Sequence, residues 1–351
     1  MHGNVAATRL GFPCAGTVAS LRSTTAIHVA AATRLGNSIT PHSALHHWTS
    51  PPACDNKSAM PSLVRKAVIP AAGYGTRFLP IAKAVPKEML PLVDKPVIQY
   101  VVEEAVASGI TDILLIISRS KRAIEEHFAP AAELEAELAA KGRTEDLEQL
   151  RKLQSMARIH YTWQPRMGGL GDAVRHARTF VGGEPFALLL GDTVVTTADS
   201  ARPVTRQLAD VVEKHGGSCV ALQEVSVEKV SRYGIMGGDE IGPGLIRARQ
   251  FVEKPKPEEA PSRLAVSARY VLSPAIFEHL DHTAPGKGGE VQITDAMASL
   301  MAVDPLFGLR FDGQRHDIGN KLDFIKANVH FGLQREDIGG ALREWLKGVV
   351  G

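Results

Sequence analysis

The sequence predicts an α/β fold in which a mostly parallel sheet has helices on both faces. Three observations predict it: short apolar segments alternate with amphipathic ones, glycine-rich loops follow the apolar segments, and the 351 residues are enough for a substantial core. Parallel strands need crossover connections, which are usually helices, so a parallel sheet requires this alternation. Such sheets bind ligands at the carboxyl ends of their strands, and the glycine loops lie at those ends.

The first elements alternate strand, helix, strand, helix. VRKAVIP at 64–70 is an apolar strand that runs into a glycine loop, and KPVIQYVVEEAVASG at 95–109 has apolar residues at helical spacing with Gly109 as its stop. TDILLIIS at 111–118 is a continuous apolar run, typical of a strand buried on both faces. KRAIEEHF at 121–128 is expected to be a second helix.

A charged segment, residues 131–157, interrupts the alternation. It is predicted to be a helical hairpin that breaks near Gly142 and either lies in solvent over the sheet or contacts another subunit. Further strands and helices are then expected at 158–164, 171–180, 186–192 and 285–302.

We expect three parts along the chain. Residues 1–59 contain one acidic residue and two copies of AATRLG, and they are expected to be a poorly ordered leader ahead of a true start at Met60, or else a transit peptide. Residues 60–335 are expected to form the main domain, with 131–157 inserted in it. Residues 336–351 are expected to form an amphipathic C-terminal helix that packs on the body or on a partner subunit.

Composition narrows the classes of partner. A net charge of +2 gives no basis for a nucleic-acid partner or an anionic membrane. No apolar run approaches the roughly 18 residues that span a bilayer. The three cysteines show no CxxC spacing, which favours inert thiols in a reducing compartment over a metal site. We therefore expect a cytoplasmic protein.

The loop AAGYGTR at 71–77 is the first candidate functional feature. Its glycines permit positive φ and allow successive backbone N–H groups to approach phosphate oxygens. It is not a Walker loop, because GxxxxGK[ST] is absent. It is not a dinucleotide fingerprint either, because Phe78 stands where GxGxxG requires glycine and Pro80 interrupts any immediate helix. By itself it is also compatible with an ordinary strand-to-helix turn.

Charged side chains follow this loop and end a later strand. Arg77 offers a planar fork for two phosphate oxygens, and Lys87, ten residues later in PKEMLP, is a compact charge. Asp192 ends the strand FALLLGD, where a carboxylate can hold Mg²⁺ between phosphates or cap a helix. These residues together predict a phosphate-binding crevice.

Several motifs in a fixed order give the chain a recognisable pattern. G-x-G-T-R-x(9)-K-E-M-L-P resembles the sugar-nucleotide pyrophosphorylases, and most closely the bacterial-type UTP–glucose-1-phosphate uridylyltransferases. The resemblance runs from about Val64 to the C-terminus. It continues through GITDILLI, QPRMGGLGDAV, VEKPKPEEAPSRLA, RYVL, GGEVQITDA and HDIGNKLDF.

This resemblance implies a fold and an activity. The fold is a Rossmann-like three-layer sandwich with a mostly parallel mixed sheet, and residues 60–335 are its nucleotidyltransferase domain. The activity is the conversion of UTP and glucose 1-phosphate to UDP-glucose and pyrophosphate with Mg²⁺. The resemblance also implies a homodimer or homotetramer.

The resemblance assigns roles to individual residues. The catalytic residues are Arg77, Lys87 and Asp192, and the Mg²⁺ ligands are Asp192 and Asp317. The nucleotide-binding residues are Ala72, Gly73, Gly75, Thr76, Glu88, Gln164 and Gly169. The residues for the sugar and its phosphate are Gly234, Glu253 and Lys254.

Physical chemistry supports some of these roles and leaves alternatives for others. The Gln164 amide presents both a donor and an acceptor, which suits the edge of a uracil. Glu88 serves the nucleotide side or pairs with a neighbouring cation. Glu253 and Lys254 are neighbours on a strand, so they point to opposite faces unless a bulge or Pro255 twists the chain; they are otherwise a surface charge pair.

Four positions depart from the family pattern. Thr193 replaces a second aspartate, Arg263 an asparagine, Asp172 a histidine and Gly168 a lysine. Two other functions therefore stay open. One is a related transferase that uses dTTP or CTP, or another sugar phosphate. The other is a non-catalytic sugar-nucleotide-binding subunit, although such a subunit would not need Arg77, Lys87, Asp192 and Asp317 together.

Overall fold

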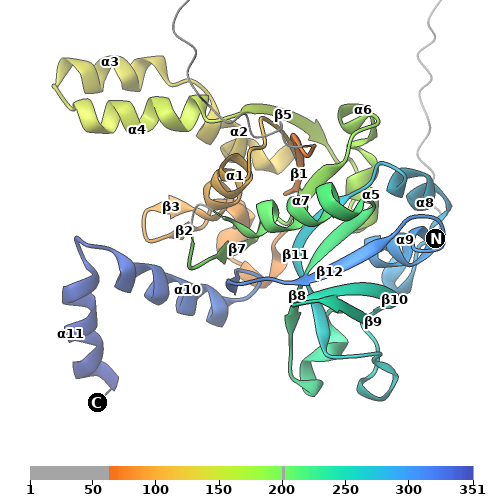
Figure 1. The fold of residues 1–351 in the computed structure, drawn as a ribbon. Helices are drawn as coiled ribbons and strands as arrows, with labels where there is room; N and C mark the ends of the chain where they lie inside the picture. The colour runs from red at the N-terminus through yellow and green to blue at the C-terminus, as the bar shows by residue number, and fades with distance from the viewer. Residues whose placement is uncertain (1–62, 200–201, 351) are drawn as a thin grey trace, which may run out of the picture. The chain divides into compact units, whose positions relative to one another are not determined.

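A nine-stranded mixed sheet forms the centre of the described part of the chain. The structure is a computed structural model that describes residues 63–199 and 202–350, and the leader expected at 1–59 lies outside them. The strand order is β5-β4-β1-β6-β11-β8-β12-β10-β9 (Figure 1). These strands are β1 (Lys66–Pro70), β4 (Asp112–Ile117), β5 (Arg158–Trp163), β6 (Phe186–Leu189), β8 (Ser218–Glu224), β9 (Gly234–Gly242), β10 (Leu245–Glu253), β11 (Leu264–Leu272) and β12 (Leu306–Arg310).

Strand direction divides the sheet. The four strands β5, β4, β1 and β6 are parallel to one another, and β12 is parallel to β8. The pairs β6–β11, β11–β8, β12–β10 and β10–β9 are antiparallel. The expected α/β fold with a mixed sheet is therefore confirmed, but the sheet is not mostly parallel: four of its neighbouring pairs are parallel and four are antiparallel. Most of the parallel pairing lies in the half that contains β1. The other half includes β9 and β10, which a tight turn joins, and such a connection makes neighbouring strands antiparallel.

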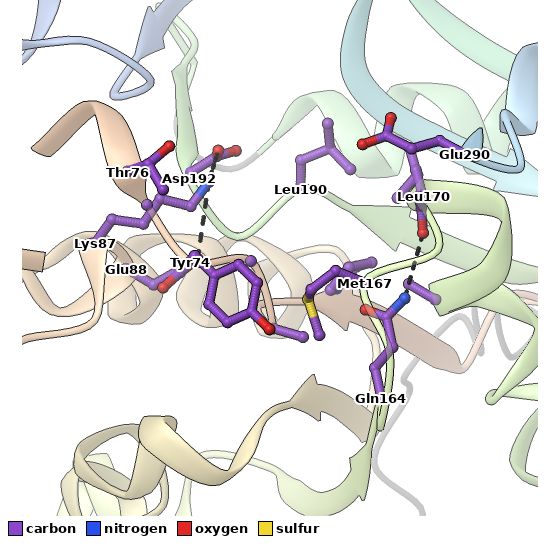
Figure 2. A pocket seen from close by; sticks show the side chains of 16 residues that line it. Tyr74, Thr76, Lys87, Glu88, Gln164, Met167, Leu170, Leu190, Asp192 and Glu290 are labelled. Atoms are coloured by element: carbon purple, nitrogen blue, oxygen red, sulfur yellow. Dashed lines mark hydrogen bonds and ion pairs between the residues drawn. The ribbon is translucent and has the colours of Figure 1, made fainter. Parts of the chain in front are cut away.

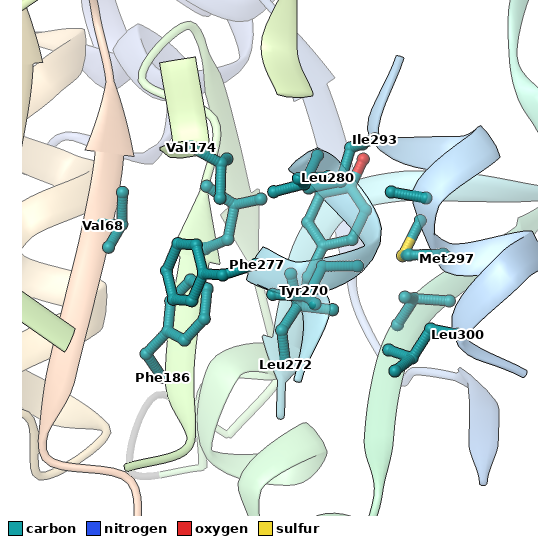
Figure 3. Close-up of a cluster of buried hydrophobic side chains, with 14 of the residues drawn as sticks. Val68, Val174, Phe186, Tyr270, Leu272, Phe277, Leu280, Ile293, Met297 and Leu300 are labelled. Atoms are coloured by element: carbon teal, nitrogen blue, oxygen red, sulfur yellow. The ribbon is translucent and has the colours of Figure 1, made fainter. Parts of the chain in front are cut away.

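Two hydrophobic cores cover the two faces of the sheet. One face packs against α1 (Val97–Ala107), α2 (Arg122–Phe128) and α7 (Val204–His215). The other packs against α5 (Leu170–Arg175), α6 (Arg178–Val181), α8 (Ile276–His282) and α9 (Ile293–Leu300), and Figure 3 shows part of this core. Alternate residues of one strand supply opposite faces: Val68 enters one core, and Ala67 and Ile69 enter the other. These layers confirm the three-layer sandwich.

Four further helices and two small sheets complete the described residues. The helices are α3 (Ala132–Ala140), α4 (Thr144–Ser155), α10 (Lys321–Gln334) and α11 (Gly339–Val350). The small sheets pair β2 (Pro91–Leu92) with β3 (Lys95–Pro96), and β7 (Thr193–Thr196) with β13 (Gln314–Asp317). Short 3-10 helices occupy Thr76–Phe78, Ile81–Lys83, Lys87–Met89, Arg119–Lys121, Val227–Arg232, Pro257–Glu259 and Lys287–Gly289. No helix in the described ranges is long and apolar enough to cross a membrane.

One expected helix differs from the structure. The single helix predicted at 171–180 is two short helices, α5 and α6. The reason is local: the N–H groups of His176 and Ala177 bond to carbonyls three residues back, which tightens the end of α5 into a turn.

Candidate active site

A cavity of about 410 Å³ opens at the carboxyl ends of β1 and β6. Three loops wall it: the loop after β1, the loop after β5 and the turn after β6 (Figure 2). Its lining residues are Pro70, Ala72, Gly73, Tyr74, Gly75, Thr76, Lys87, Glu88, Gln164, Met167, Gly169, Leu170, Ala173, Leu190, Asp192 and Glu290. This is the edge of the sheet at which the sequence predicts a ligand.

Glycine 75 brings two parts of the first loop together. Its φ is +65°, in the left-handed region that side chains rarely adopt. A Cβ added there would lie 3.2 Å from the Cβ of Lys87. Glycine thus lets the loop after β1 pass close to the 3-10 helix Lys87–Met89, so that Thr76 and Lys87 line the same cavity.

Lys87 and Asp192 form an ion pair at one end of the cavity. The Nζ of Lys87 donates to Oδ2 of Asp192 at 2.5 Å, and Figure 2 shows this contact. Burial lowers the pKa of Lys87, but the carboxylates of Asp192 and Glu88 outweigh it and hold that pKa above its ordinary value. Burial raises the pKa of Asp192, but Lys87 outweighs it and holds that pKa below its ordinary range. Both groups are therefore charged at neutral pH.

Glu88 is almost fully buried beneath this pair. It accepts a hydrogen bond from the Nζ of Lys121 at 2.8 Å, and Lys87 lies 3.9 Å away. Burial raises the pKa of Glu88, while Lys121 and then Lys87 oppose the rise. Of the two roles that the sequence left open, the geometry shows pairing with neighbouring cations, at a position that also lines the cavity.

A bulge in β11 supports the turn that carries Asp192. The register of β11 on β8 shifts between Val266 and Tyr270, and Ala268 within the bulge has φ +57°. The Ala268 carbonyl accepts from the N–H of Leu190 at 3.1 Å. Bulges often lie beside active sites, where they redirect the chain, and this one holds the turn that leads from β6 to Asp192.

A buried ion pair anchors the same turn from behind. The side chain of Arg269 is fully buried; its Nη2 donates to the Thr193 carbonyl at 2.8 Å and to Glu104 at 2.7 Å. Glu104 also accepts from the Thr205 hydroxyl at 2.7 Å. The sequence analysis missed Arg269 and Glu104, although the RYVL motif contained the former. An arginine within an otherwise apolar strand was the available signal.

Asp317 and Arg77 lie outside the lining of this cavity. The β7–β13 pairing places Asp317 opposite Thr193, so the backbones of the two expected metal ligands are neighbours. The Asp317 carboxylate, however, accepts from the Gly319 N–H at 2.8 Å, lies 3.6 Å from Arg315, and lines a different cavity. The Nη1 of Arg77 lies 3.7 Å from where a Cβ on Gly319 would be. Arg77 is therefore close to the turn that follows Asp317.

The loop after β5 is held to a second loop around Glu290. Gly169 has φ +97°, and a Cβ there would lie 2.8 Å from the Cβ of Glu290. The N–H of Val291 bonds to the Gly168 carbonyl at 2.7 Å. Gln164, at the base of the loop after β5, is 5% exposed and lines the cavity. Close contact between the two loops thus requires glycine at 169.

Two of the three expected sugar-phosphate residues, Glu253 and Lys254, line a second cavity of about 560 Å³. Glu290 lines both cavities, so the two are neighbours. Glu253 accepts from the Thr294 hydroxyl at 2.6 Å and pairs with Lys254 at 2.9 Å. Gly234 lies opposite Glu253, where a Cβ would come within 3.2 Å of the carboxylate.

The backbone at Lys254 explains how neighbouring residues share a face. Lys254 has φ +45°, which breaks the strand alternation that separates consecutive side chains. Its ammonium group consequently reaches the Glu253 carboxylate. The twist that the sequence analysis required is present, at Lys254 itself.

The sequence analysis also missed several residues that line the cavity. They are Pro70, Tyr74, Met167, Leu170, Ala173, Leu190 and Glu290. Glu290 had a usable signal, since it follows two glycines in the GGEVQITDA motif. The apolar residues had none, because a side chain that faces a cavity and one that faces the core look alike in sequence.

Comparison with known proteins places the chain in a family. The model of the nucleotidyl transferase family matches residues 66–332. The chain belongs to the nucleotidyl transferase family. The matched range includes every strand of the nine-stranded sheet and the residues expected to form the site.

Relatives and solved structures agree with this membership. The UTP–glucose-1-phosphate uridylyltransferase YngB of Bacillus subtilis is 48% identical over 287 residues, covering 82% of this chain and 96% of the relative. The UTP–glucose-1-phosphate uridylyltransferase of Streptococcus pneumoniae is 47% identical over 289 residues, which cover 82% of this chain and 96% of the relative. The resemblance inferred from the sequence motifs is thereby confirmed.

Solved structures show the same likeness in three dimensions. A UDP-glucose pyrophosphorylase complexed with UDP-glucose has a TM-score of 0.71 at 39% identity, covering 78% of this chain and 100% of that chain. A UTP-bound UGPase from Acinetobacter baumannii has a TM-score of 0.75 at 35% identity, covering 81% and 98%. A putative glucose-1-phosphate thymidylyltransferase from Bacillus anthracis, at 24% identity and a TM-score of 0.57, covers 75% and 93% and shares the fold.

Proposed function

We propose that this protein transfers the uridylyl group of UTP to glucose 1-phosphate, forming UDP-glucose and releasing pyrophosphate. The observation that carries the proposal is that two neighbouring cavities share Glu290. One has glycine loops and the Lys87–Asp192 pair, and the other has Glu253 and Lys254. Relatives described with that activity are similar to this chain over 82% of its length.

The proposed reaction brings two anions together. An oxygen of glucose 1-phosphate attacks the α-phosphorus of UTP, a new P–O bond forms, and the bond from the α-phosphorus to the β-phosphate bridge breaks. Pyrophosphate leaves with that electron pair. The nucleophile is already anionic at neutral pH, so no general base is needed, and catalysis consists of positioning and charge neutralisation.

The chain's own residues divide this work. Lys87 and Arg77 would neutralise the triphosphate, and Lys254 the phosphate of the sugar. Ala72, Gly73 and Gly169 would contact the base or its ribose, and Gly75 and Thr76 the phosphates. Glu253 would accept from the sugar hydroxyls, and Gly234 would admit the sugar close to the backbone.

The site fits a divalent metal, which we propose to be Mg²⁺. Carboxylate oxygens are the donors that Mg²⁺ prefers, and it commonly uses one or two of them and keeps its waters. Asp192 and Asp317 are neighbouring in backbone position, and they would hold it once the Asp317 carboxylate turned from Arg315 toward Asp192. When bound, the ion supplies positive charge between phosphate groups. Within the described residues, no cluster of three or more metal-binding side chains competes for it.

A direct assay tests the proposal. Purified protein with UTP, glucose 1-phosphate and Mg²⁺ is expected to form UDP-glucose and pyrophosphate in equal amounts, and a chelator is expected to stop the reaction until Mg²⁺ is restored. Faster turnover with dTTP would indicate thymidylyl transfer instead. Binding of UDP-glucose without any turnover would support a non-catalytic binding protein.

We further propose that the protein is a cytoplasmic homodimer or homotetramer. Exposed apolar side chains on the last two helices support self-association: Ile325 on α10, and Trp345 and Val349 on α11, are each about 60% exposed. The buried, unpaired thiol of Cys219 is consistent with a reducing compartment. Light scattering of the purified chain measures the oligomeric mass.

A further inference from the structure

Asp172, on the first turn of α5, holds the side-chain amide of Gln164 from behind the cavity wall. The Nε2 of Gln164 donates to Oδ2 of Asp172 at 2.7 Å, and more weakly to the Gly169 carbonyl at 3.4 Å. Asp172 does not line the cavity, whereas Gln164 does. The aspartate therefore acts on the cavity only through the amide that it holds.

This arrangement determines which end of the amide faces a ligand. Both partners on the Asp172 side, a carboxylate oxygen and a carbonyl oxygen, accept hydrogen bonds and donate none. If the amide turned over, its oxygen would face those two oxygens and its NH₂ group would lose both acceptors. The amide NH₂ group is consequently turned away from the ligand, and Figure 2 shows the Gln164 oxygen on the side of Met167 and the cavity.

Gly168 makes room for the carboxylate. A Cβ added at this position would lie 2.7 Å from Cγ of Asp172 and 2.9 Å from its Oδ2. Such distances force a displacement of the carboxylate that accepts from Gln164. Gly168 and Asp172, two of the four positions at which the chain departs from the family pattern, thus form one structural unit.

We infer that Asp172 is a positioning residue that makes Gln164 a fixed hydrogen-bond acceptor and so selects uracil over cytosine. The inference rests on the proposed function and on Gln164 facing the base. Uracil carries an N–H group at N3, which donates to the Gln164 oxygen. Cytosine has a bare N3 acceptor there, which would face that oxygen without a proton between them. Thymine has the same N–H group as uracil, so Asp172 does not separate UTP from dTTP.

The test compares nucleotide preferences in two variants. Asp172→Ala frees the amide to turn over, and we expect the ratio of kcat/KM for UTP to that for CTP to fall about tenfold, as for the loss of one net hydrogen bond. The change should appear mainly in KM. The ratio of UTP to dTTP should stay unchanged and serves as the internal control. Asp172→Asn retains an acceptor oxygen and should keep more of the UTP preference.

A third variant keeps the inference testable if Asp172→Ala does not fold. Gly168→Ala keeps the aspartate but displaces its carboxylate, and it should shift the UTP to CTP ratio in the same direction. If Asp172 only stabilises α5, UTP and CTP will lose activity equally and their ratio will not move, which overturns the inference.

Equilibrium binding separates this inference from the proposed function. Kd values for UTP and CTP in the wild type and in each variant report base preference without turnover. A wild type that binds UTP but forms no UDP-glucose contradicts the proposed function alone. If the wild type prefers UTP and the Asp172→Ala variant prefers UTP to the same degree as the wild type, only the role of Asp172 is contradicted. A wild type that binds CTP as tightly as UTP overturns the selection of uracil.

Discussion

Lys87 is the side chain on which the proposed chemistry depends most. An isolated buried ammonium group tends to lose its proton, because burial disfavours the charged form. Here the carboxylates of Asp192 and Glu88 overcome that tendency, and the pKa of Lys87 lies above its ordinary value. The same pairs hold the ammonium group at the edge of the cavity, so no reorganisation is needed to place it there.

Replacing Lys87 tests this role. Lys87→Ala is expected to lower kcat by about 10²- to 10³-fold, the effect of removing one preorganised charged donor. Lys83→Ala is the matched control, because Lys83 is an exposed lysine of the same loop that does not line the cavity. Steady-state kinetics with UTP and glucose 1-phosphate measure both. A Lys87→Ala protein as active as Lys83→Ala would remove Lys87 from the mechanism.

His316 gives the fold a dependence on pH. Burial, and then the neighbouring His330, lower the pKa of His316 from 6.5 to about 4. Because its folded pKa is below its unfolded pKa, the unfolded chain takes up the proton first. The contribution of neutral His316 to the free energy of unfolding is therefore complete above pH 6.5 and is lost as the pH falls toward 4.

Denaturation across this range measures the effect. The free energy of unfolding is expected to fall by about 3 kcal/mol between pH 6.5 and pH 4 through His316. His316→Gln should flatten the curve, whereas the exposed His282→Gln should not change its slope. An unchanged slope in His316→Gln would assign the pH dependence to other groups.

Individual side chains also show how far sequence reasoning reaches. Lys87, Gln164 and Asp192, which the sequence analysis expected at the site, line the cavity, whereas Arg77 lies outside its lining. Their partners were not predictable: nothing in the sequence pairs Gln164 with Asp172, or turns the Asp317 carboxylate toward Arg315. Such pairings depend on side-chain directions that a loop acquires only when it packs.

The bulged strand β11 is the element that positions the turn that carries Asp192. Its left-handed Ala268 is unfavourable by itself, so surrounding contacts must hold it. They include the fully buried Arg269 and Glu104 and the hydrogen bond from Leu190. Breaking the Arg269–Glu104 ion pair should therefore unfold the turn that carries Asp192 and also destabilise the core.

Removing one partner of the pair provides the measurement. Arg269→Met leaves the Glu104 carboxylate buried without its cation, and we expect a loss of about 3–5 kcal/mol in the free energy of unfolding. Glu103 is next to Glu104 on α1 and forms a partly exposed ion pair with Lys95 of β3. Glu103→Gln removes this pair and should cost under about 1 kcal/mol. Urea denaturation of both variants compares them. Equal losses would show that the buried pair has no special role.

Elements were predictable where their periodicity was clear. The strands around β1, β4 and β6 and the helices α1 and α2 lie where the apolar spacing places them. The break between α5 and α6 was not visible, because helical spacing continues across it. The bulge in β11 was not visible either, since it arises from pairing with β8 and not from the local sequence.

Across the whole molecule, the candidate site is divided between two sets of elements. The cavity proposed for the nucleotide lies at the ends of the parallel strands β1, β5 and β6, and the cavity proposed for the sugar lies at the end of the antiparallel strand β10 and at α9. Their cavities share Glu290. Substitutions on one side should therefore affect one substrate more than the other.

Lys254 tests this division. Lys254→Ala is expected to raise KM for glucose 1-phosphate at least about tenfold, since a charge-assisted contact to a phosphate is lost, while KM for UTP changes little. Arg249→Ala is the control, because Arg249 is an exposed cation on β10 that pairs with Asp239 and lines neither cavity. A rise in KM for UTP alone would place Lys254 on the nucleotide side.

The sequence alone establishes the order of the strands and helices up to β6, the glycine loops and the charged residue types, because each follows from local periodicity or from the chemistry of nearby residues. Strand direction across the second half of the sheet, the face that Lys254 shares with Glu253, and the partners of Gln164 and Asp317 come from tertiary structure. These features depend on contacts between residues far apart in the chain or on one unusual backbone angle. Local spacing does not encode either of them.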